Sequence, residues 1–162
     1  MRVSGFDLAG PDATWDRFVA ASAQPSYLQT SAWATIKAPN GWRATRMAAD
    51  GFGTQVLLAR RRGVPWGIGY VPRGPVQAEP LDRAALASFT RDMRTIARED
   101  RLAWVRAEPE MEDSPAAREA LANLGWVPAP HVQPDRTRII DISQDDIAFL
   151  RDWVDAPGST YV

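Results

Sequence analysis

Residues 42–71 read WRATRMAADGFGTQVLLARRRGVPWGIGYV, and this stretch decides the fold. It holds three segments rich in β-branched, aromatic and other apolar residues, at 42–48, 54–61 and 66–71. Glycine-containing turn signals separate them, DGFG at 50–53 and RGVP at 62–65. Strands joined by such short turns pair antiparallel, so the stretch predicts a three-stranded meander.

Helices and further strands are predicted on both sides of the meander. Before it we expect a strand over 1–9, a helix from Asp12 or Thr14 to about 23, and a helix from Thr30 or Ser31 to about 37. After it we expect a helix over 81–100, a buried strand over 102–107 and a helix over 115–124 that ends at Gly125. We then expect an extended segment from Trp126, a strand over 136–142 and a helix over 144–154. The order predicts an α+β fold, with a mixed, mostly antiparallel sheet flanked by helices. We expect one domain over 1–154 and an irregular tail over 155–162.

Composition narrows the chemistry. The chain has 162 residues, a net charge of −1 and no cysteine. The net charge offers no excess that would hold a nucleic-acid backbone unaided. Without cysteine there is no thiolate nucleophile or disulfide framework. His131 is the only histidine and stands beside a proline, which argues against metal sites and Ser-His-Asp catalysis.

The N-terminal segment MRVSGFDLAG has no apolar run of the kind that a signal peptide or an anchor needs. No stretch approaches the ~20 apolar residues of a membrane span, so a cytoplasmic protein is expected.

Lys37 stands out by composition. Of the 19 basic residues, it is the only lysine. One reading is chance in a chain whose codons favour arginine. The other is that this position needs a compact, flexible ammonium that a planar guanidinium does not replace.

Three stretches resemble the Fem-type (FemABX) peptidoglycan-bridge aminoacyltransferases. The first is YLQTSAWATIK at 27–37, with an aromatic residue, Leu-Gln-Thr, then Trp and Lys four apart. The second is YVPRGPV at 70–76, similar to the family's loop after the third meander strand. The third is QP at 133–134 followed by TRIIDI at 137–142, similar to the last strand of the family's first domain. The resemblance covers about 15–150 and implies a GNAT-like acyltransferase fold.

Trp33 and Lys37 are four residues apart, so both lie on one face of the second helix. Lys37 falls in the last turn, where the helix dipole favours a cation. A core tryptophan with an exposed capping lysine would give the same pattern. The resemblance favours ligand binding, because the matching lysine in Fem-type enzymes contacts the nucleotide-sugar precursor.

The loop PRGP at 72–75 is stiff, since two prolines fix their own backbone. Gly74 lets the backbone approach a ligand, and the planar fork of Arg73 suits a phosphate or carboxylate. Tyr70, at the strand end, offers a hydroxyl. A turn-stabilising arginine and a plain strand tyrosine are equal alternatives.

The resemblance implies transfer of an amino acid from aminoacyl-tRNA to the peptide of a UDP-linked or lipid-linked muramyl precursor. The attacking group is an amine of the acceptor, so neither a protein nucleophile nor a cofactor is required. The enzyme's work would be positioning and oxyanion stabilisation. Asp50 and Glu79 lie near the meander, but spacing selects neither as a general base.

The sequence also departs from the family. Complete members have two such domains, and many carry a helical arm that assists tRNA, whereas this chain ends after the first domain. It is thus expected to be either a truncated version or a stand-alone half that mainly binds the acceptor. A non-catalytic module that binds the precursor is one alternative. An acetyl-CoA-dependent N-acetyltransferase is another, although RRRGVP at 60–65 is a poor match to a pyrophosphate loop because it lies between two strands.

Overall fold

The computed structural model describes residues 11–49, 52–78, 82–130 and 132–134. The chain divides into two compact units, Met1–Pro130 and His131–Val162, and the architecture below belongs to the first. The strands predicted over 1–9 and 136–142, the helix predicted over 144–154 and the tail over 155–162 lie outside the described residues. The single domain over 1–154 stays a prediction.

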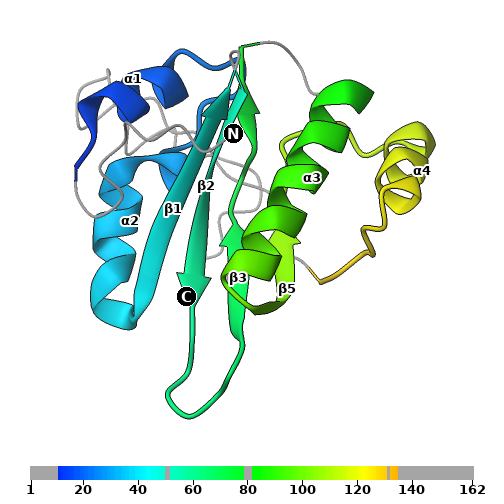
Figure 1. Ribbon diagram of the computed structural model, residues 1–162. Coiled ribbons are helices and arrows are strands. Elements are labelled where there is room, and N and C mark those ends of the chain that lie inside the picture. The colour runs from blue at the N-terminus through cyan, green and yellow to red at the C-terminus, as the bar shows by residue number, and fades with distance from the viewer. Residues whose placement is uncertain (1–10, 50–51, 79–81, 131, 135–162) are drawn as a thin grey trace, which may run out of the picture. The chain divides into compact units, whose positions relative to one another are not determined.

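A mixed sheet forms the centre of the first unit (Figure 1). Its strands are β1 (Trp42–Ala49), β2 (Phe52–Ala59), β3 (Gly67–Val71), β4 (Val76–Gln77) and β5 (Leu102–Ala107). The strand order is β1-β2-β3-β5, and β4 pairs with β2. The first three pair antiparallel, which confirms the predicted meander. β5 runs parallel to β3, so the carboxyl ends of these two strands meet at one edge of the sheet.

Each of the four helices in the described residues begins directly after a polar residue that caps it. They are α1 (Ala13–Ala20), α2 (Ser31–Lys37), α3 (Arg83–Glu99) and α4 (Pro115–Asn123), with short 3-10 turns η1 (Tyr27–Gln29) and η2 (Ala38–Asn40). Asp12, Thr30, Asp82 and Ser114 each accept a hydrogen bond from a backbone N–H of the first turn. Such a cap satisfies a donor that the helix itself leaves unpaired.

The sheet face under α3 is apolar. Figure 1 shows α3 crossing in front of the sheet. Between this face and α3 lies a cluster of buried apolar side chains from three strands and the helix: Met47, Val56, Leu58, Val71, Phe89, Met93 and Ile96. Trp126 closes this cluster by stacking on Phe89 at 5.6 Å between ring centroids and donating its indole N–H to Thr90 at 2.8 Å.

The opposite face of the sheet is partly polar although it is buried. At one end α1 packs Trp15 and Val19 against Val76. Beside them the fully buried side chains of Gln29 and Gln55 are hydrogen-bonded to the backbone. Buried polar groups cost free energy unless they are paired, so this face depends on a defined hydrogen-bond network.

Four local predictions need correction. α1 ends at Ala20 rather than about 23, because the Ser22 hydroxyl donates to the Val19 carbonyl and the chain then bonds to β4. β5 was predicted to be buried, but Trp104 is 50% exposed. Trp126 begins no strand, because its backbone N–H donates to the Leu121 carbonyl in α4. β4 was not predicted, since two residues carry no periodicity. The α+β class, with a mixed and mostly antiparallel sheet between helices, is confirmed, and within the described residues the helices and strands follow in the predicted order, with β4 added.

Candidate functional site

Helix α2 is fixed at its beginning by α1. The Thr30 hydroxyl accepts from the Trp33 N–H at 3.3 Å, and the Asp16 carboxylate accepts from both the N–H and the hydroxyl of Ser31 at 2.6 Å. Charge-assisted bonds of this kind are stronger than neutral ones. They set the direction of a helix only seven residues long, and so they place its last residue, Lys37.

The structure brings Trp33 and Lys37 together as predicted. The Lys37 Nζ lies 4.7 Å from the centroid of the Trp33 ring. Tyr27 meets the same ring edge-on, with 5.7 Å between centroids, and is itself 68% exposed. Within the described part of the chain, the Trp33 indole N–H has no hydrogen-bond acceptor. We call Tyr27, Trp33 and Lys37 the α2 cluster.

An ammonium over an aromatic face is attracted by the ring quadrupole, by about 0.5–1 kcal/mol where it is accessible to water. That attraction is weak enough for an anionic ligand to compete with it. The α2 cluster therefore holds a cation over one aromatic ring, against which a second ring packs, and no carboxylate of the described residues is paired with that cation.

The loop at 72–75 is anchored from below by Gln29. The Gln29 amide nitrogen donates to the Pro72 carbonyl at 2.7 Å, and its amide oxygen accepts from the Gln55 N–H at 2.8 Å. A Cβ added to Gly74 would lie 2.7 Å from the Gln29 side chain. Close contact with Gln29 thus explains a glycine here, whereas ligand contact at Gly74 stays a prediction.

Arg73 projects from this loop with a positive φ of 47°. This left-handed conformation is uncommon for a residue with a Cβ, and it is typical of positions that the surrounding structure holds in place. The Arg73 guanidinium forms an ion pair with Glu110 at 2.9 Å, in which both side chains remain partly exposed. The peptide between Gly74 and Pro75 is cis.

Tyr70 is paired with a carboxylate that the sequence did not single out. Its hydroxyl donates to Glu108 at 2.7 Å, and both residues are half-buried. Glu108 and Glu110 follow β5, whereas Tyr70 and Arg73 lie at the end of β3 and just beyond it. β3 and β5 are parallel neighbours, so their carboxyl ends lie at the same edge of the sheet. There the phenol of Tyr70 meets the carboxylate of Glu108, and the guanidinium of Arg73 meets that of Glu110. We call Tyr70, Arg73, Glu108 and Glu110 the edge cluster.

The α2 cluster and Tyr70 lie on the same side of the sheet. Tyr70 is the register partner of Leu57, and along β2 the side chain of Leu57 points to the same face as that of Gln55. The Gln55 amide donates to the Thr30 carbonyl, directly before α2. Among the described residues, however, no hydrogen bond or ion pair joins the two clusters. Asp50, Glu79 and His131 lie outside the described residues.

Among the described residues, no helix is both long enough and apolar enough to cross a bilayer.

Comparison with known proteins bears on the same residues. The FemAB family model matches residues 11–119, which contain the α2 cluster and the edge cluster. The crystal structure of FemX superposes with a TM-score of 0.62 and 25% identity, over 69% of this chain and 29% of that chain. A second match, to the crystal structure of a probable acetyltransferase, covers 79% of this chain and 87% of that chain, with a TM-score of 0.43 and 12% identity. This similarity is too low to bear on the family of the chain. No curated protein sequence matches the chain significantly.

Proposed function

The chain belongs to the FemAB family, and on that premise we propose that it is the acceptor-binding part of an aminoacyltransferase. The reaction is transfer of an amino acid from aminoacyl-tRNA to the peptide of a UDP-linked or lipid-linked muramyl precursor. Charged tRNA is a cytoplasmic molecule, so we assign the reaction to the cytoplasm. The chain spans 29% of the length of FemX, and the activity of a whole enzyme is part of the proposal.

The observation that carries the proposal is the α2 cluster. Lys37 is held over Trp33 at 4.7 Å, and the structure describes no carboxylate paired with it. A diphosphate is the strongest anion of the precursor, and a mobile ammonium on a four-carbon stem binds it as a point charge. The exposed ring of Tyr27 adds a flat apolar surface against Trp33.

The edge cluster offers the second set of contacts. The acceptor's amine attacks the ester carbonyl of aminoacyl-tRNA, a new C–N bond forms, and the ester C–O bond to the tRNA breaks. In this exchange the amine loses one proton and the departing ribose oxygen of the tRNA gains one, so the tRNA leaves with a free hydroxyl. The Glu108 carboxylate, hydrogen-bonded to Tyr70, is a proton acceptor of the right kind, and Arg73 can turn from Glu110 toward a substrate carboxylate. Gly74 keeps the loop that carries Arg73 in contact with Gln29.

Acetyl-CoA chemistry is disfavoured by local structure. Residues 60–65 lie in the hairpin between β2 and β3. A pyrophosphate loop uses the backbone N–H groups at the beginning of a helix, and no helix begins there.

Calorimetric titration of the chain with UDP-muramyl-pentapeptide tests the proposal. We expect saturable binding that Lys37→Ala weakens about tenfold or more, since a charged hydrogen bond contributes ~1.5–3 kcal/mol. Arg83→Ala, an exposed cation in the first turn of α3, is the matched control and leaves binding unchanged. Equal binding by wild type and Lys37→Ala would remove the α2 cluster from the site. A parallel transfer assay with charged tRNA separates an enzyme from a module that only binds.

A further inference from the structure

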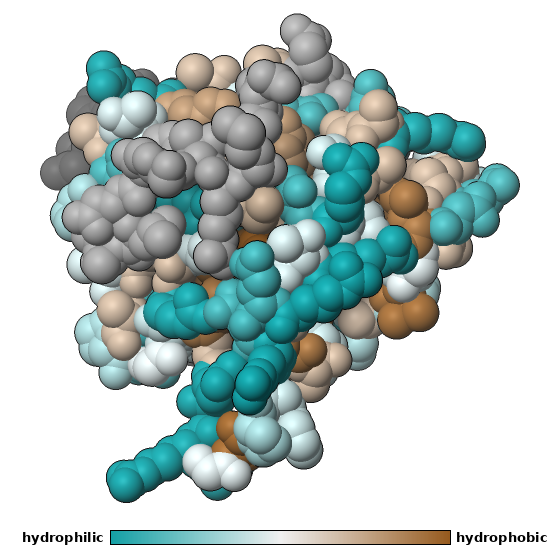
Figure 2. All heavy atoms as spheres, in the orientation of Figure 1, coloured by the Kyte–Doolittle hydropathy of each residue, from teal (hydrophilic) through white to brown (hydrophobic). Residues whose placement is uncertain are grey.

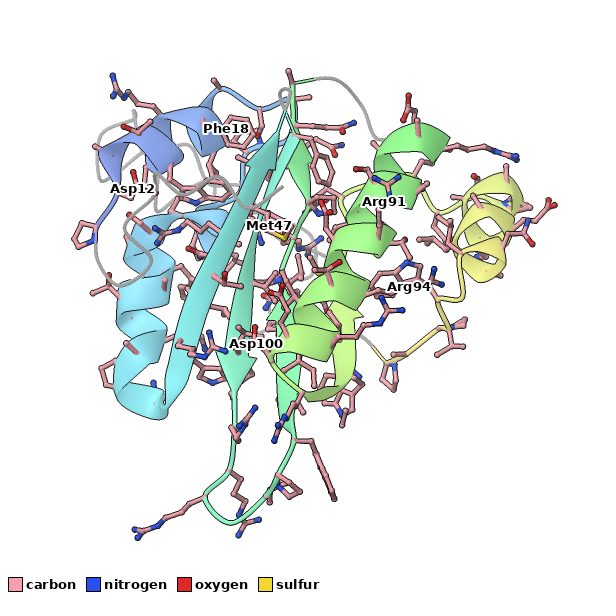
Figure 3. The ribbon with its side chains drawn as sticks, in the orientation of Figure 1. Asp12, Phe18, Met47, Arg91, Arg94 and Asp100 are labelled. Atoms are coloured by element: carbon pink, nitrogen blue, oxygen red, sulfur yellow. The ribbon has the colours of Figure 1, made fainter. Side chains whose placement is uncertain are left out.

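One end of the sheet is strongly basic. The hairpin between β2 and β3 carries three consecutive arginines, Arg60, Arg61 and Arg62, and all three are exposed. They lie next to the turn after α3, because the Arg60 guanidinium donates to the Asp100 carbonyl at 2.6 Å and the Gly67 N–H donates to the Arg101 carbonyl at 2.9 Å. Figure 3 shows Asp100 at this lower end of α3, with the hairpin extending below it.

The charges here contrast with those of the whole chain. The hairpin, the start of β1 and the end of α3 bring together six basic residues and two acidic ones: Arg43, Arg60, Arg61, Arg62, Arg98 and Arg101, with Glu99 and Asp100. Figure 2 shows hydrophilic side chains gathered over this part of the face. The chain as a whole has a net charge of −1. The net charge of the chain is therefore close to zero while the electrostatic potential at this end of the sheet is positive, and the local potential is what attracts an anionic partner. We call these residues, together with Trp66, the basic end.

Most of this positive charge is available to a partner. Arg43 is paired with Asp100. Among the described residues Arg61, Arg62 and Arg101 form no ion pair. Like charges placed side by side on an exposed hairpin repel one another, so three adjacent arginines destabilise it slightly unless an anion is bound.

A cavity of about 600 Å³ opens at the same end. Its lining includes the basic residues Arg43, Arg60 and Arg101, the acidic residues Glu99 and Asp100, the ring of Trp42, and Ala38 and Gly41, which follow α2. That volume is in the range of small-ligand sites and suits a nucleotide. Beyond it, in the hairpin, Trp66 is 56% exposed. Arginines that follow a phosphate chain, interleaved with exposed aromatic rings on which bases stack, are the features of single-stranded nucleic-acid sites.

We propose that the basic end binds RNA through its phosphates, with Trp66 stacking on an unpaired base. The identity of that RNA as the donor tRNA rests on the proposed function. An anionic membrane surface would also attract arginine and tryptophan. A flat layer of lipid headgroups does not fill a cavity, however, and a cavity of this volume with three arginines in its lining favours RNA.

The test is fluorescence anisotropy of the full chain with uncharged, 3′-labelled bulk tRNA over a range of salt concentrations. The double variant R61Q/R62Q removes two exposed charges that make no described side-chain contact. We expect it to weaken binding about tenfold near 0.1 M salt and to lower the slope of log K against log salt by about 2, one for each lost phosphate contact. Trp66→Ala weakens binding about fivefold and leaves the salt slope unchanged, because stacking releases no counterions.

The matched control is R83Q/R91Q, which removes the same charge from α3 away from the hairpin; Figure 3 shows Arg91 well above Asp100 on that helix. It leaves affinity and slope as in wild type, and thermal unfolding of every variant checks the fold. Three outcomes overturn the proposal: no tRNA binding by wild type, an equal loss in both double variants, or loss of binding to phosphatidylglycerol vesicles by R61Q/R62Q with tRNA binding intact. R61Q/R62Q leaves the titration with UDP-muramyl-pentapeptide unchanged, so failure here and failure of the proposed function are distinguishable.

Discussion

The two faces of the sheet are buried by different means. Under α3 the contacts are apolar, and residues such as Val56, Phe89 and Ile96 fill the space. On the other face Gln29, Gln55 and Arg46 are just as buried, but they hold their neighbours through directed hydrogen bonds. Apolar packing tolerates small shifts at modest cost, whereas a buried hydrogen-bond network specifies one arrangement. The loop at 72–75 and the residues that lead into α2 are attached to the second kind of face, so we expect mutations there to affect ligand binding as well as stability.

Phe89→Ala tests the apolar face and has the largest expected effect. The Phe89 side chain is fully buried between Phe52 and the stacked ring of Trp126. Its loss removes buried apolar surface and leaves a cavity, which lowers the free energy of unfolding by about 3–5 kcal/mol. Urea unfolding followed by tryptophan fluorescence measures it. Ile36→Ala, 60% exposed on α2, is the control and changes stability by less than ~0.5 kcal/mol. At urea concentrations where Phe89→Ala is still folded, it binds the precursor normally; weakened binding would contradict the division between the faces.

Gln29→Ala tests the polar face. It leaves the Gln55 N–H and the Pro72 carbonyl buried without their partners. Each unsatisfied group costs ~1–3 kcal/mol, so we expect a loss of about 2–3 kcal/mol in unfolding free energy after some relaxation. Unlike Phe89→Ala, it also weakens precursor binding, because the loop carrying Arg73 loses its anchor. Gln24→Ala, at an exposed position, is the matched control. A stability loss with unaltered binding would show that the anchor does not position the site.

Gly74→Ala is a smaller change to the same contact. The added Cβ meets the Gln29 amide at 2.7 Å and the Val71 side chain at 2.9 Å, and Gln29 is held by its own hydrogen bonds. Overpacking of this kind costs about 1–3 kcal/mol. Gly41→Ala separates crowding from backbone strain, because Gly41 has a φ of 79° but open space around it, and its cost is ~1 kcal/mol. Thermal unfolding compares the two. Only Gly74→Ala reduces precursor binding on our account, and an equal reduction in Gly41→Ala would speak against it.

The meander and the four helices of the described region follow from local sequence, because turn residues, caps and apolar periodicity act within a few positions. Asp12 and Thr30 each cap a helix, as the sequence predicts. The i, i+4 spacing of Trp33 and Lys37 was sufficient to predict that both lie on one helix face, where the ammonium is found over the ring.

What could not be predicted depends on residues distant in sequence. Glu108 meets Tyr70 across 38 positions only because β5 joins the sheet parallel to β3. Two carboxylates directly after a predicted strand were the available signal. The exposure of Trp104 and the basic end also follow from where β5 and the hairpin lie in space, which neither the composition of the chain nor its net charge reveals.

Binding of the precursor at the α2 cluster can be measured directly, because Lys37 is the only lysine of the chain. Reductive ¹³C-methylation labels Lys37 and the N-terminal amine, so a two-dimensional ¹H–¹³C spectrum contains one lysine signal. Dimethylation keeps the positive charge. We predict that UDP-muramyl-pentapeptide shifts the Lys37 signal saturably, with the same dissociation constant as calorimetry, and leaves the N-terminal signal in place. Calorimetric binding of the precursor to the methylated chain with an unmoved Lys37 signal would contradict the assignment of the precursor to this cluster.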